Sequence, residues 1–384
     1  MTNSPENLRK ILVTGSDGLI GWHLRAWLYT LAERFEVNSC NRQQFNDADY
    51  LKTAVSSADV IVHLAGMNRG DEEEIYNTNR DLAQRIVSFC EQTESKPHVI
   101  YSSSTHIDGP SRYGASKKIA GEILEQWAQR AGAKFCNMVL PHVFGEHGKP
   151  FYNSAVSTFC HQLANGESLQ VNGDGQVNLF HTHDVALLVT EIIDGGITGE
   201  QRPDGSPMSV QELATRLETM TGRYLGGVIP QFNEKIDWQL FNTWRSYLPH
   251  EKRAIDLTLH EDNRGDLFEA ARADGKGQVF LSTSHPGITR GEHFHFRKVE
   301  RFLVVQGTAE IKLRRIFTDD VFTCKVDGSR PQAFDIPTLH THNITNVGDG
   351  PLLALFWTGE HFDPDDADTW RLLVEQSEPQ TAKA

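Results

Sequence analysis

Residues 10–21 read K-I-L-V-T-G-S-D-G-L-I-G, and this stretch decides the fold of the first part of the chain. The apolar run before Gly15 predicts a buried strand, and the apolar spacing over 19–33 predicts a helix directly after it. Strand and helix then alternate again, with strands predicted at 35–39, 60–64, 98–101 and 135–140 and helices around 80–91 and 114–131. This order favours an α/β fold built on a doubly wound parallel sheet.

The turn between the first strand and helix is rich in glycine. Such a turn lets a pyrophosphate approach backbone N–H groups at the N-terminus of the helix. The alternative interpretation is a tight strand-to-helix turn without a ligand. On the nucleotide interpretation, the residues expected at the phosphates are Gly15, Asp17, Gly18, Leu19, Ile20 and Gly21.

The end of the next predicted strand, Asn38-Ser39-Cys40-Asn41-Arg42, bears on the choice of cofactor. NAD-binding domains usually place a carboxylate here against the ribose 2′-hydroxyl, and this stretch has none. Arg42, next to Asn41, can instead pair with a 2′-phosphate. The sequence therefore predicts NADP(H), and the alternative is a solvated surface arginine.

A tyrosine and a lysine stand one helical turn apart in Tyr113-Gly114-Ala115-Ser116-Lys117, which follows a strand ending in Ser102-Ser103-Ser104. This spacing puts Tyr113 and Lys117 on one face. A free tyrosine has a pKa of about 10, so it exchanges protons near neutrality only beside a cation such as Lys117. A serine hydroxyl can bind a substrate carbonyl while Tyr113 protonates the alkoxide formed by hydride transfer.

Together these motifs resemble the extended short-chain dehydrogenase/reductase family, which has a Rossmann-type fold. The resemblance also rests on Asp59–Gly66, which reads D-V-I-V-H-L-A-G. It implies a catalytic serine that falls best on Ser104, with Ser103 left open. It further implies that the cofactor contacts Leu64, Ala65, Gly66 and Lys117.

The segment His181-Thr182-His183-Asp184 could suggest a metal site. It resembles the late strand-to-helix junction of the same family. Both histidines are therefore interpreted as structural.

A second chemical signature lies at 287–307, which read G-I-T-R-G-E-H-F-H-F-R-K-V-E-R-F-L-V-V-Q-G. His293 and His295 alternate, so on a strand both imidazoles face one side, and Glu300 on the next strand can join them. His342 is the fourth candidate ligand, and His340 competes with it. These donors fit zinc, although iron, manganese or nickel binds the same set.

This spacing resembles the first motif of metal-binding cupin barrels. Residues 337–346 resemble the second motif, with Leu339 where glycine is usual. The alternative is a barrel that keeps ligand-like residues for packing or for hydrogen bonds at an interface.

The sequence pattern changes at about Leu259, from alternating strands and helices to short β-type runs broken by turn residues. Short alternating runs at 278–282, 301–305, 310–314 and 352–357 predict an all-β barrel. Two domains are expected, 1–250 and 251–384, with the boundary within Leu248–Arg253.

Composition excludes some partners. A formal net charge of −14 gives no attraction for nucleic acid or for anionic membranes. The five cysteines form no Cys-x-x-Cys pair, and no segment resembles a signal peptide or a membrane span. We expect a cytoplasmic protein that does not insert into membranes.

The whole chain, reductase followed by cupin, resembles the CapF family of capsular polysaccharide synthesis enzymes, also through Lys149–Ser154 and His361–Pro364. That resemblance implies C3 epimerisation of a UDP-4-keto-6-deoxy-N-acetylhexosamine by the cupin domain, then C4 reduction with NADPH. Asn153 is a substrate candidate within the first of these segments. Arg264 and Glu269 are further substrate candidates, since residues 262–269 resemble the deoxysugar-nucleotide epimerases, and a β-turn salt link is the alternative.

Two rival functions remain at this point. The cupin could serve only as a metal-stabilised dimerisation module, since such barrels often pair through edge strands; a homodimer is expected in either case. The chain could also be a non-catalytic NADP(H)-binding scaffold. The serine, tyrosine and lysine set argues against the scaffold, because a sensor needs no proton donor beside a nicotinamide.

Overall fold

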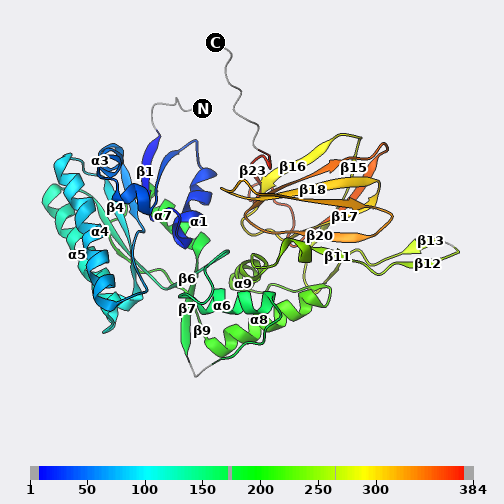
Figure 1. The fold of residues 1–384 in the computed structure, drawn as a ribbon, viewed down its shortest axis with the longest axis horizontal. Helices are drawn as coiled ribbons and strands as arrows, with labels where there is room; N and C mark the ends of the chain where they lie inside the picture. Colours follow the sequence, from blue (N-terminus) through cyan, green and yellow to red (C-terminus); the bar gives the residue numbers. More distant parts are fainter. Residues whose placement is uncertain (1–7, 172–174, 264, 376–384) are drawn as a thin grey trace, which may run out of the picture. The chain divides into compact units, whose positions relative to one another are not determined.

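The computed structural model describes residues 8–171, 175–263 and 265–375. Its packing separates two compact units, which are described one at a time (Figure 1). The N-terminal unit comprises Met1–Thr158 and Val171–Leu213, and the C-terminal unit comprises Phe159–Gln170 and Ala214–Ala384. Every helix in the described part of the chain is too short or too polar to span a lipid bilayer.

The N-terminal unit is built on a six-stranded sheet in the order β2-β1-β3-β4-β5-β8, and all of its pairings are parallel. The strands are β1 Arg9–Thr14, β2 Phe35–Cys40, β3 Val60–His63, β4 His98–Ser104, β5 Phe135–Leu140 and β8 Gly199–Gln201. The helices and turn between them are α1 Leu19–Tyr29, α2 Arg42–Asn46, α3 Ala48–Ser57, α4 Glu72–Gln92, η2 Thr105–Asp108, α5 Arg112–Ala131 and α7 Thr182–Gly195.

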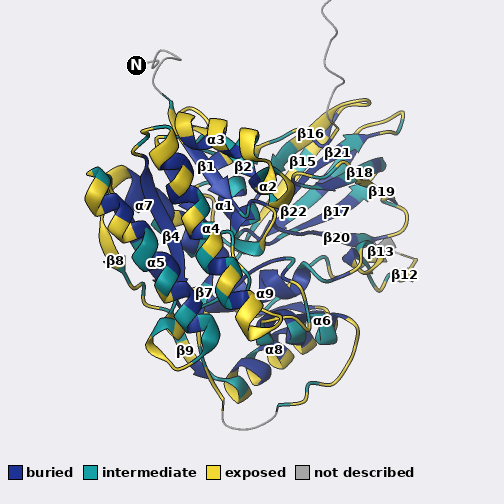
Figure 2. Cartoon of the chain, turned by 60° about the vertical axis from the view of Figure 1, so that its left-hand side comes forward, coloured by how far each residue is buried: buried dark blue, intermediate teal, exposed yellow. Residues whose placement is uncertain are grey.

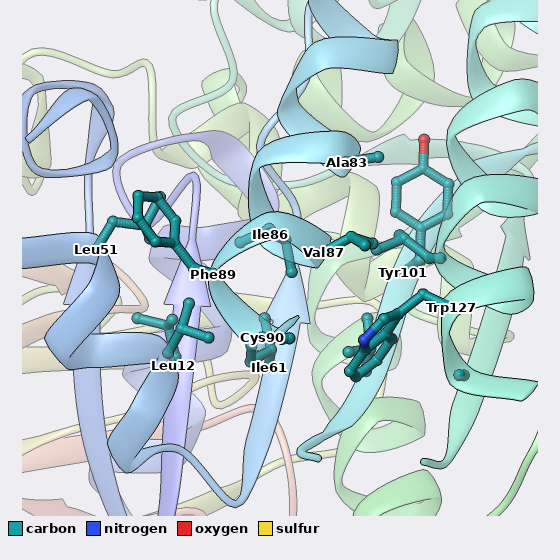
Figure 3. Packing of buried hydrophobic residues seen from close by; sticks show 14 of the residues in the cluster. Leu12, Leu51, Ile61, Ala83, Ile86, Val87, Phe89, Cys90, Tyr101 and Trp127 are labelled. Atoms are coloured by element: carbon teal, nitrogen blue, oxygen red, sulfur yellow. The ribbon is translucent and has the colours of Figure 1, made fainter. Parts of the chain in front are cut away.

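Helices cover both faces of this sheet because successive strand residues point to opposite sides. Leu12 of β1 packs with α4 and α5, whereas Ile11 and Val13 pack with α1 and α7. Figure 3 shows the first of these layers, in which Tyr101 of β4 and Trp127 of α5 lie beside the α4 side chains. The inner strands β1, β3, β4 and β5 are mostly buried, while the helices expose their outer faces (Figure 2).

A small sheet of three strands completes the N-terminal unit. Its order is β6-β7-β9, with β6 His142–Phe144, β7 Gln176–His181 and β9 Ser206–Ser209. The sequence did not predict this sheet, because its strands are only three to six residues long. The loop after β6 leads to the predicted substrate residue Asn153.

The C-terminal unit contains two five-stranded sheets, β11-β20-β17-β22-β15 and β19-β18-β21-β16-β23. Apolar residues of both sheets form one core, including Phe302, Ile311, Phe334 and Ile344. The strands of these sheets are β11 Ala254–Asp256, β15 Gln278–Ser284, β16 Thr289–Phe294, β17 Glu300–Gln306, β18 Thr308–Arg315, β19 Val321–Asp327, β20 Gln332–Ile336, β21 His340–Asn346, β22 Leu352–Thr358 and β23 Trp370–Arg371.

The remaining elements are short strands and helices. The strands are β10 Val228–Ile229, β12 His260–Asp262, β13 Gly265–Leu267 and β14 Arg272–Ala273. The helices are α6 Ala155–Ala164, α8 Val210–Leu225, α9 Lys235–Arg245 and η3 His250–Arg253.

Most of α8 and all of α9 belong to the C-terminal unit. Tyr224 of α8 donates to Asp335 of β20, and this carboxylate also pairs with Arg301 of β17 at 2.6 Å. Arg245 of α9 donates to the carbonyl oxygen of Ile336 at 2.5 Å. The packing therefore divides the chain before α9, whereas the sequence placed the boundary at 250/251, where the β-rich segment begins. As a boundary between folding domains, 250/251 stays a prediction.

The predicted fold class is confirmed. The first unit has the doubly wound parallel sheet of a Rossmann-type domain, and the second contains, beside its helices, the two antiparallel sheets expected of a cupin-type barrel.

Candidate active sites

The glycine-rich turn joins β1 to α1 at the carboxyl edge of the parallel sheet. Gly15 has a φ of +69°, and a Cβ there would lie 2.8 Å from the backbone nitrogen of Ala65. A Cβ on Gly21 would lie 2.3 Å from the carbonyl oxygen of Gly15. Gly18 is the N-cap of α1 and supplies no capping side chain. The turn thus keeps its backbone close to β3 and its first-turn amides open, which is the form that a pyrophosphate requires.

The other predicted phosphate residues lie at the same turn. Leu19 and Ile20 form the first turn of α1, and Asp17 is exposed, with a carboxylate oxygen 3.4 Å from Arg25. At the end of β3, the backbone nitrogen of Leu64 bonds the carbonyl oxygen of Thr14 at 3.3 Å. Ala65 and Gly66 follow directly, so both strand ends meet at this edge.

Asn41 and Arg42 lie where β2 passes into α2. The Asn41 side chain accepts a hydrogen bond from the Gln44 amide at 3.0 Å, and the Gln44 side-chain oxygen accepts one from the Asn41 amide at 2.9 Å. Asn41 therefore caps α2. Arg42, in the first turn of this helix, is exposed at the edge of the sheet.

Ser104 lies close enough to Tyr113 for its side chain to lower the pKa of the phenol. Ser104 ends β4, and Tyr113 lies in the first turn of α5, which Ser111 caps. Burial raises the pKa of Tyr113 to about 12, while Ser104 acts in the opposite direction. Tyr113 is therefore protonated at neutral pH, as a proton donor must be.

The structure distinguishes the two serines that the sequence left open. Because neighbouring strand residues point to opposite faces, Ser103 is directed away from the side on which Ser104 meets Tyr113. Ser103 is buried, and its hydroxyl has no hydrogen-bond partner within the described part of the chain. This geometry favours Ser104 as the serine of the site.

Lys117 is buried one turn after Tyr113. Its Nζ lies 4.6 Å from the centroid of the Tyr101 ring, and a Cβ on Gly66 would lie 3.5 Å from it. Burial lowers the pKa of Lys117 to about 7. The sequence predicted that Lys117 would act on the Tyr113 hydroxyl; in the structure its ammonium group faces Tyr101 and the end of β3.

Asn153 is exposed in the loop after β6. Arg69, which follows the end of β3, donates to the carbonyl oxygens of Phe151 and Tyr152 at 2.7 and 2.6 Å. These two bonds tie the loop that carries Asn153 to the segment after Gly66. Asn153 thus lies in the same unit as the serine, tyrosine and lysine.

The second site lies in the C-terminal unit, where His293, His295, Glu300 and His342 come together. One potential ligand atom from each lies within 4.8 Å of all the others. His293 of β16 pairs directly with His342 of β21, next to a bulge at Gly291. His340 has its Nδ1 2.9 Å from the carbonyl oxygen of Thr338 and is not part of this group.

Backbone carbonyls orient two imidazoles of this group. Nδ1 of His295 donates to the carbonyl oxygen of Asp368 at 2.5 Å, and Nδ1 of His342 donates to that of His340 at 3.3 Å. Each of these two rings therefore keeps its other nitrogen for the centre, as is usual for histidines that bind metal.

The charges of the group also suit a divalent cation. Burial, together with His342 and His295, lowers the pKa of His293 to about 3, so this ring is neutral. Burial alone would raise the pKa of Glu300, but His295 and His342 outweigh it and hold it well below its usual range. Nε2 of His342 is buried and lies 3.4 Å from Glu300 without a hydrogen bond. A neutral imidazole at His293, a carboxylate and an unsatisfied inward nitrogen fit a metal such as zinc.

Leu339 shows how this chain departs from the usual second cupin motif. It has a φ of +58°, a conformation that favours glycine, and it is buried. Its amide donates to the carbonyl oxygen of His295 at 2.8 Å. The backbone thus keeps the left-handed turn although the residue is not glycine.

The two remaining substrate candidates are Glu269 and Arg264. Glu269 is exposed and forms two hydrogen bonds with Arg272, at 2.7 and 2.5 Å, which is the local salt link considered as the alternative. Arg264 lies outside the described residues.

Comparison with known proteins agrees with both halves of the chain. Residues 11–201 match the NAD dependent epimerase/dehydratase family, and 260–370 match the Polysaccharide biosynthesis C-terminal domain. The UDP-2-acetamido-2,6-beta-L-arabino-hexul-4-ose reductase of Pseudomonas aeruginosa is 31% identical over 372 residues, covering 95% of this chain and 99% of that protein. The capsular polysaccharide assembling protein CapF from Staphylococcus aureus has a crystal structure with 31% identity and a TM-score of 0.62, covering 95% of this chain and 100% of that one. The chain belongs to the CapF family.

A shorter relative matches part of the chain. The spore coat polysaccharide biosynthesis protein SpsL of Bacillus subtilis is 27% identical over 128 residues, which is 30% of this chain and 83% of that protein.

The matched N-terminal family is NAD dependent, so the first site is that of a nicotinamide dinucleotide. The open glycine turn fits this cofactor.

Sequence reasoning missed several residues that shape these sites. The side chain of Asn79 on α4 accepts from the Met67 amide at 2.7 Å and donates to the Met67 carbonyl oxygen and to Ser116 at 2.8 Å. It therefore fixes the segment after Gly66 against α5. Asp368 was also missed, because it is one of several acidic residues in 363–368 and nothing in the sequence marks it.

Proposed function

We propose that the protein converts a UDP-4-keto-6-deoxy-N-acetylhexosamine in two steps. The barrel epimerises C3, and the N-terminal unit then reduces the C4 ketone with NADPH. The product is UDP-2-acetamido-2,6-dideoxy-L-talose, a precursor of UDP-N-acetyl-L-fucosamine for capsule or O-antigen synthesis. The observation that carries this proposal is the placement of Ser104 beside Tyr113, with Lys117 buried one turn later, in a chain 31% identical to a protein named as a hexul-4-ose reductase.

Reduction uses three residues of the N-terminal unit. Ser104 donates a hydrogen bond to the C4 carbonyl oxygen, and protonated Tyr113 transfers its proton to that oxygen as the alkoxide forms. Lys117 of α5, whose ammonium group faces the segment after β3, holds the ribose of the dinucleotide and adds positive charge. A bound NADPH supplies the hydride.

The order of the two steps follows from acidity. The hydrogen on C3 can be removed only while C4 is a ketone, because the carbonyl oxygen then takes up the negative charge. Epimerisation therefore precedes reduction.

His293, His295, Glu300 and His342 would hold one divalent ion, with zinc the first choice. When bound, such an ion supplies a Lewis acid for the ketone oxygen, and each ~1.4 kcal/mol of stabilisation is about tenfold in rate. The protein contributes the three imidazoles, the carboxylate and the backbone carbonyls that orient His295 and His342.

The proposal includes a homodimer in the cytoplasm, where NADPH and nucleotide sugars are available. The outer strand β15 forms an edge of its sheet and exposes Val279 and Leu281. An apolar edge strand of this kind is a ready partner for a second copy. Light scattering after size exclusion measures the mass that decides this point.

The experiment that tests the function is NMR of the UDP-4-keto sugar incubated with the protein in deuterated buffer, before and after addition of NADPH. Deuterium at C3 before NADPH, followed by reduction at C4, is the expected result. Reduction without deuterium would leave a reductase with a barrel that serves only dimerisation. NADPH binding with neither signal would leave a non-catalytic scaffold.

A further inference from the structure

Asp368 stands apart from the other acidic residues of the segment 363–368. Its neighbour Asp366 has an exposed side chain, whereas Asp368 is 5% exposed. Asp368 also has a φ of +43°, in the left-handed region that is unusual for a residue other than glycine. A buried carboxylate on a strained backbone indicates that the surrounding structure holds this residue in place.

The main chain of Asp368 touches the candidate metal centre. Its carbonyl oxygen accepts the Nδ1–H of His295 at 2.5 Å. Because Nδ1 is thereby committed to the backbone, Nε2, 3.0 Å from Glu300, is the ring nitrogen left for an ion. The Asp368 carbonyl thus selects the tautomer in which His295 can bind an ion.

The side chain of Asp368 holds the turn that connects two of the ligands. One carboxylate oxygen accepts the backbone N–H of Phe296 at 3.0 Å, and the other accepts those of Arg297 and Lys298, both at 2.9 Å. These residues form the link between His295 and Glu300. A carboxylate that binds three consecutive amides fixes the path of this link, and with it the separation of the two ligands.

Neighbouring residues also hold the 296–298 turn against the segment before β23. Arg297 pairs with Glu360 at 3.2 Å and with Asp366 at 2.8 Å, and the Lys298 ammonium donates to the carbonyl oxygen of Ala367 at 2.7 Å. The segment before β23 is therefore tied to the turn at several points. Only Asp368 reaches both the turn and an imidazole of the group among the contacts described here.

We propose that Asp368 is a positioning residue of the metal centre, which sets the tautomer of His295 and the spacing between His295 and Glu300. This inference rests on the proposed metal site. The segment before β23 thereby positions two ligands, His295 directly after β16 and Glu300 at the start of β17.

The test compares the Zn²⁺ affinity of the full-length wild-type chain, Asp368→Asn and Asp366→Asn, by competition with a chromophoric chelator. Asparagine keeps the size and the carbonyl of Asp368 but accepts through only one side-chain oxygen. We expect Asp368→Asn to weaken Zn²⁺ binding about 10- to 100-fold. Asp366→Asn also removes a contact to Arg297, and its affinity should stay within about twofold of wild type.

A spectroscopic readout separates positioning from stability. In the Co²⁺-loaded protein, Asp368→Asn should change the energy and intensity of the visible bands, whereas Asp366→Asn should leave them unchanged. Should Asp368→Asn fail to fold, Asp368→Gly carries the test, because glycine tolerates the positive φ and keeps the carbonyl while losing all three amide contacts.

Equal Zn²⁺ affinity and equal Co²⁺ spectra for wild type and the Asp368 variants would overturn the inference while leaving the metal site intact. A wild-type chain that binds neither Zn²⁺ nor Co²⁺ would overturn the metal site itself, and the inference with it.

Discussion

Lys117 is a buried cation whose charge costs stability. Because its folded-state pKa of about 7 lies below the unfolded value of about 10.4, the folded chain binds this proton less tightly than the unfolded chain. The penalty is complete below about pH 7 and disappears as the pH rises toward 10.4. Lys117 therefore resembles other active-site residues that are kept for function at the expense of stability.

We expect Lys117→Met to raise the free energy of unfolding at pH 6 by an amount of the order of 2 kcal/mol and to lower the reduction rate about 100-fold. Urea titrations at pH 6 and pH 10 measure the first effect, which should shrink at the higher pH. Lys118→Met, the exposed neighbour, is the matched control and should change neither quantity. A destabilised Lys117→Met at pH 6 would contradict the assigned burial penalty.

Arg42 is exposed in the first turn of α2, directly after β2, and is the residue that we propose to contact a ribose 2′-phosphate. Replacing it with alanine should weaken NADPH binding about tenfold and leave NADH binding within about twofold, because only NADPH carries the phosphate. Fluorescence titration with each cofactor measures the two dissociation constants. Gln43→Ala, next to it on α2, is the control. An equal loss for both cofactors would show that Arg42 does not contact the 2′-phosphate.

At the scale of residues, the sequence predicted which side chains gather but not how they are held. Period-two spacing was enough to bring His293 and His295 to one side of a strand. The choice between Ser103 and Ser104 required the pairing of β4 with its neighbours, since both serines stand at the same strand end. The role of Asp368 depends on a positive φ and on contacts 70 residues or more apart in sequence, which no local pattern encodes.

Three elements of the N-terminal unit meet at a buried carboxylate. One oxygen of Glu146, in the loop after β6, lies 3.3 Å from His23 of α1 and 3.2 Å from His181 at the end of β7. Nδ1 of His23 donates to Leu19, and Nδ1 of His181 accepts from the His183 amide. Both rings therefore direct Nε2 toward the carboxylate. This arrangement gives His181 the structural role expected from its sequence context.

The contribution of ionised Glu146 to the stability of the fold depends on pH in a predictable way. Burial alone would raise its pKa, but His181 and His23 outweigh it and hold the pKa well below the usual range. The folded-state pKa is thus depressed, so the contribution to stability is present above the unfolded pKa of about 4.3 and is lost as the pH falls through the folded value.

We expect Glu146→Gln to lower the free energy of unfolding at pH 7 by about 2 kcal/mol, and the difference from wild type to shrink as the pH falls below 4. Denaturant titrations across this range provide the measurement. Glu125→Gln, on the exposed side of α5, is the control with the same change of charge. A difference that grows at acid pH would refute the ionised state of Glu146.

At the scale of the whole molecule, the two architectures could be predicted, but their extent along the chain could not. The strand-helix alternation of the first part and the short β runs of the second each leave a hydrophobic pattern that can be recognised in a single sequence. The membership of α8 and α9 in the C-terminal unit depends instead on the buried contacts of Tyr224 with Asp335 and of Arg245 with Ile336. A helix that packs through buried polar groups gives no signal of its partner in its own pattern.

Each proposed site draws all of its residues from one unit, so changes in one should spare the other. Tyr113→Phe removes the proton donor with little change in volume, and we expect C4 reduction to fall about 100-fold or more while C3 exchange in deuterated buffer persists. His295→Ala should release the metal and abolish C3 exchange, while reduction of a ketone already epimerised at C3 continues. Tyr29→Phe and His285→Ala, both exposed, are the matched controls.

The pair of variants tests the division of labour more strictly than either alone. NMR of C3 exchange, NADPH oxidation and the metal content of each purified variant give the three readouts. If Tyr113→Phe also abolished C3 exchange, the two reactions would share a site in the N-terminal unit, and the barrel would lose its assigned chemistry. If His295→Ala kept both its metal and C3 exchange, the four-residue ligand group would be wrong, although the reductase assignment would stand.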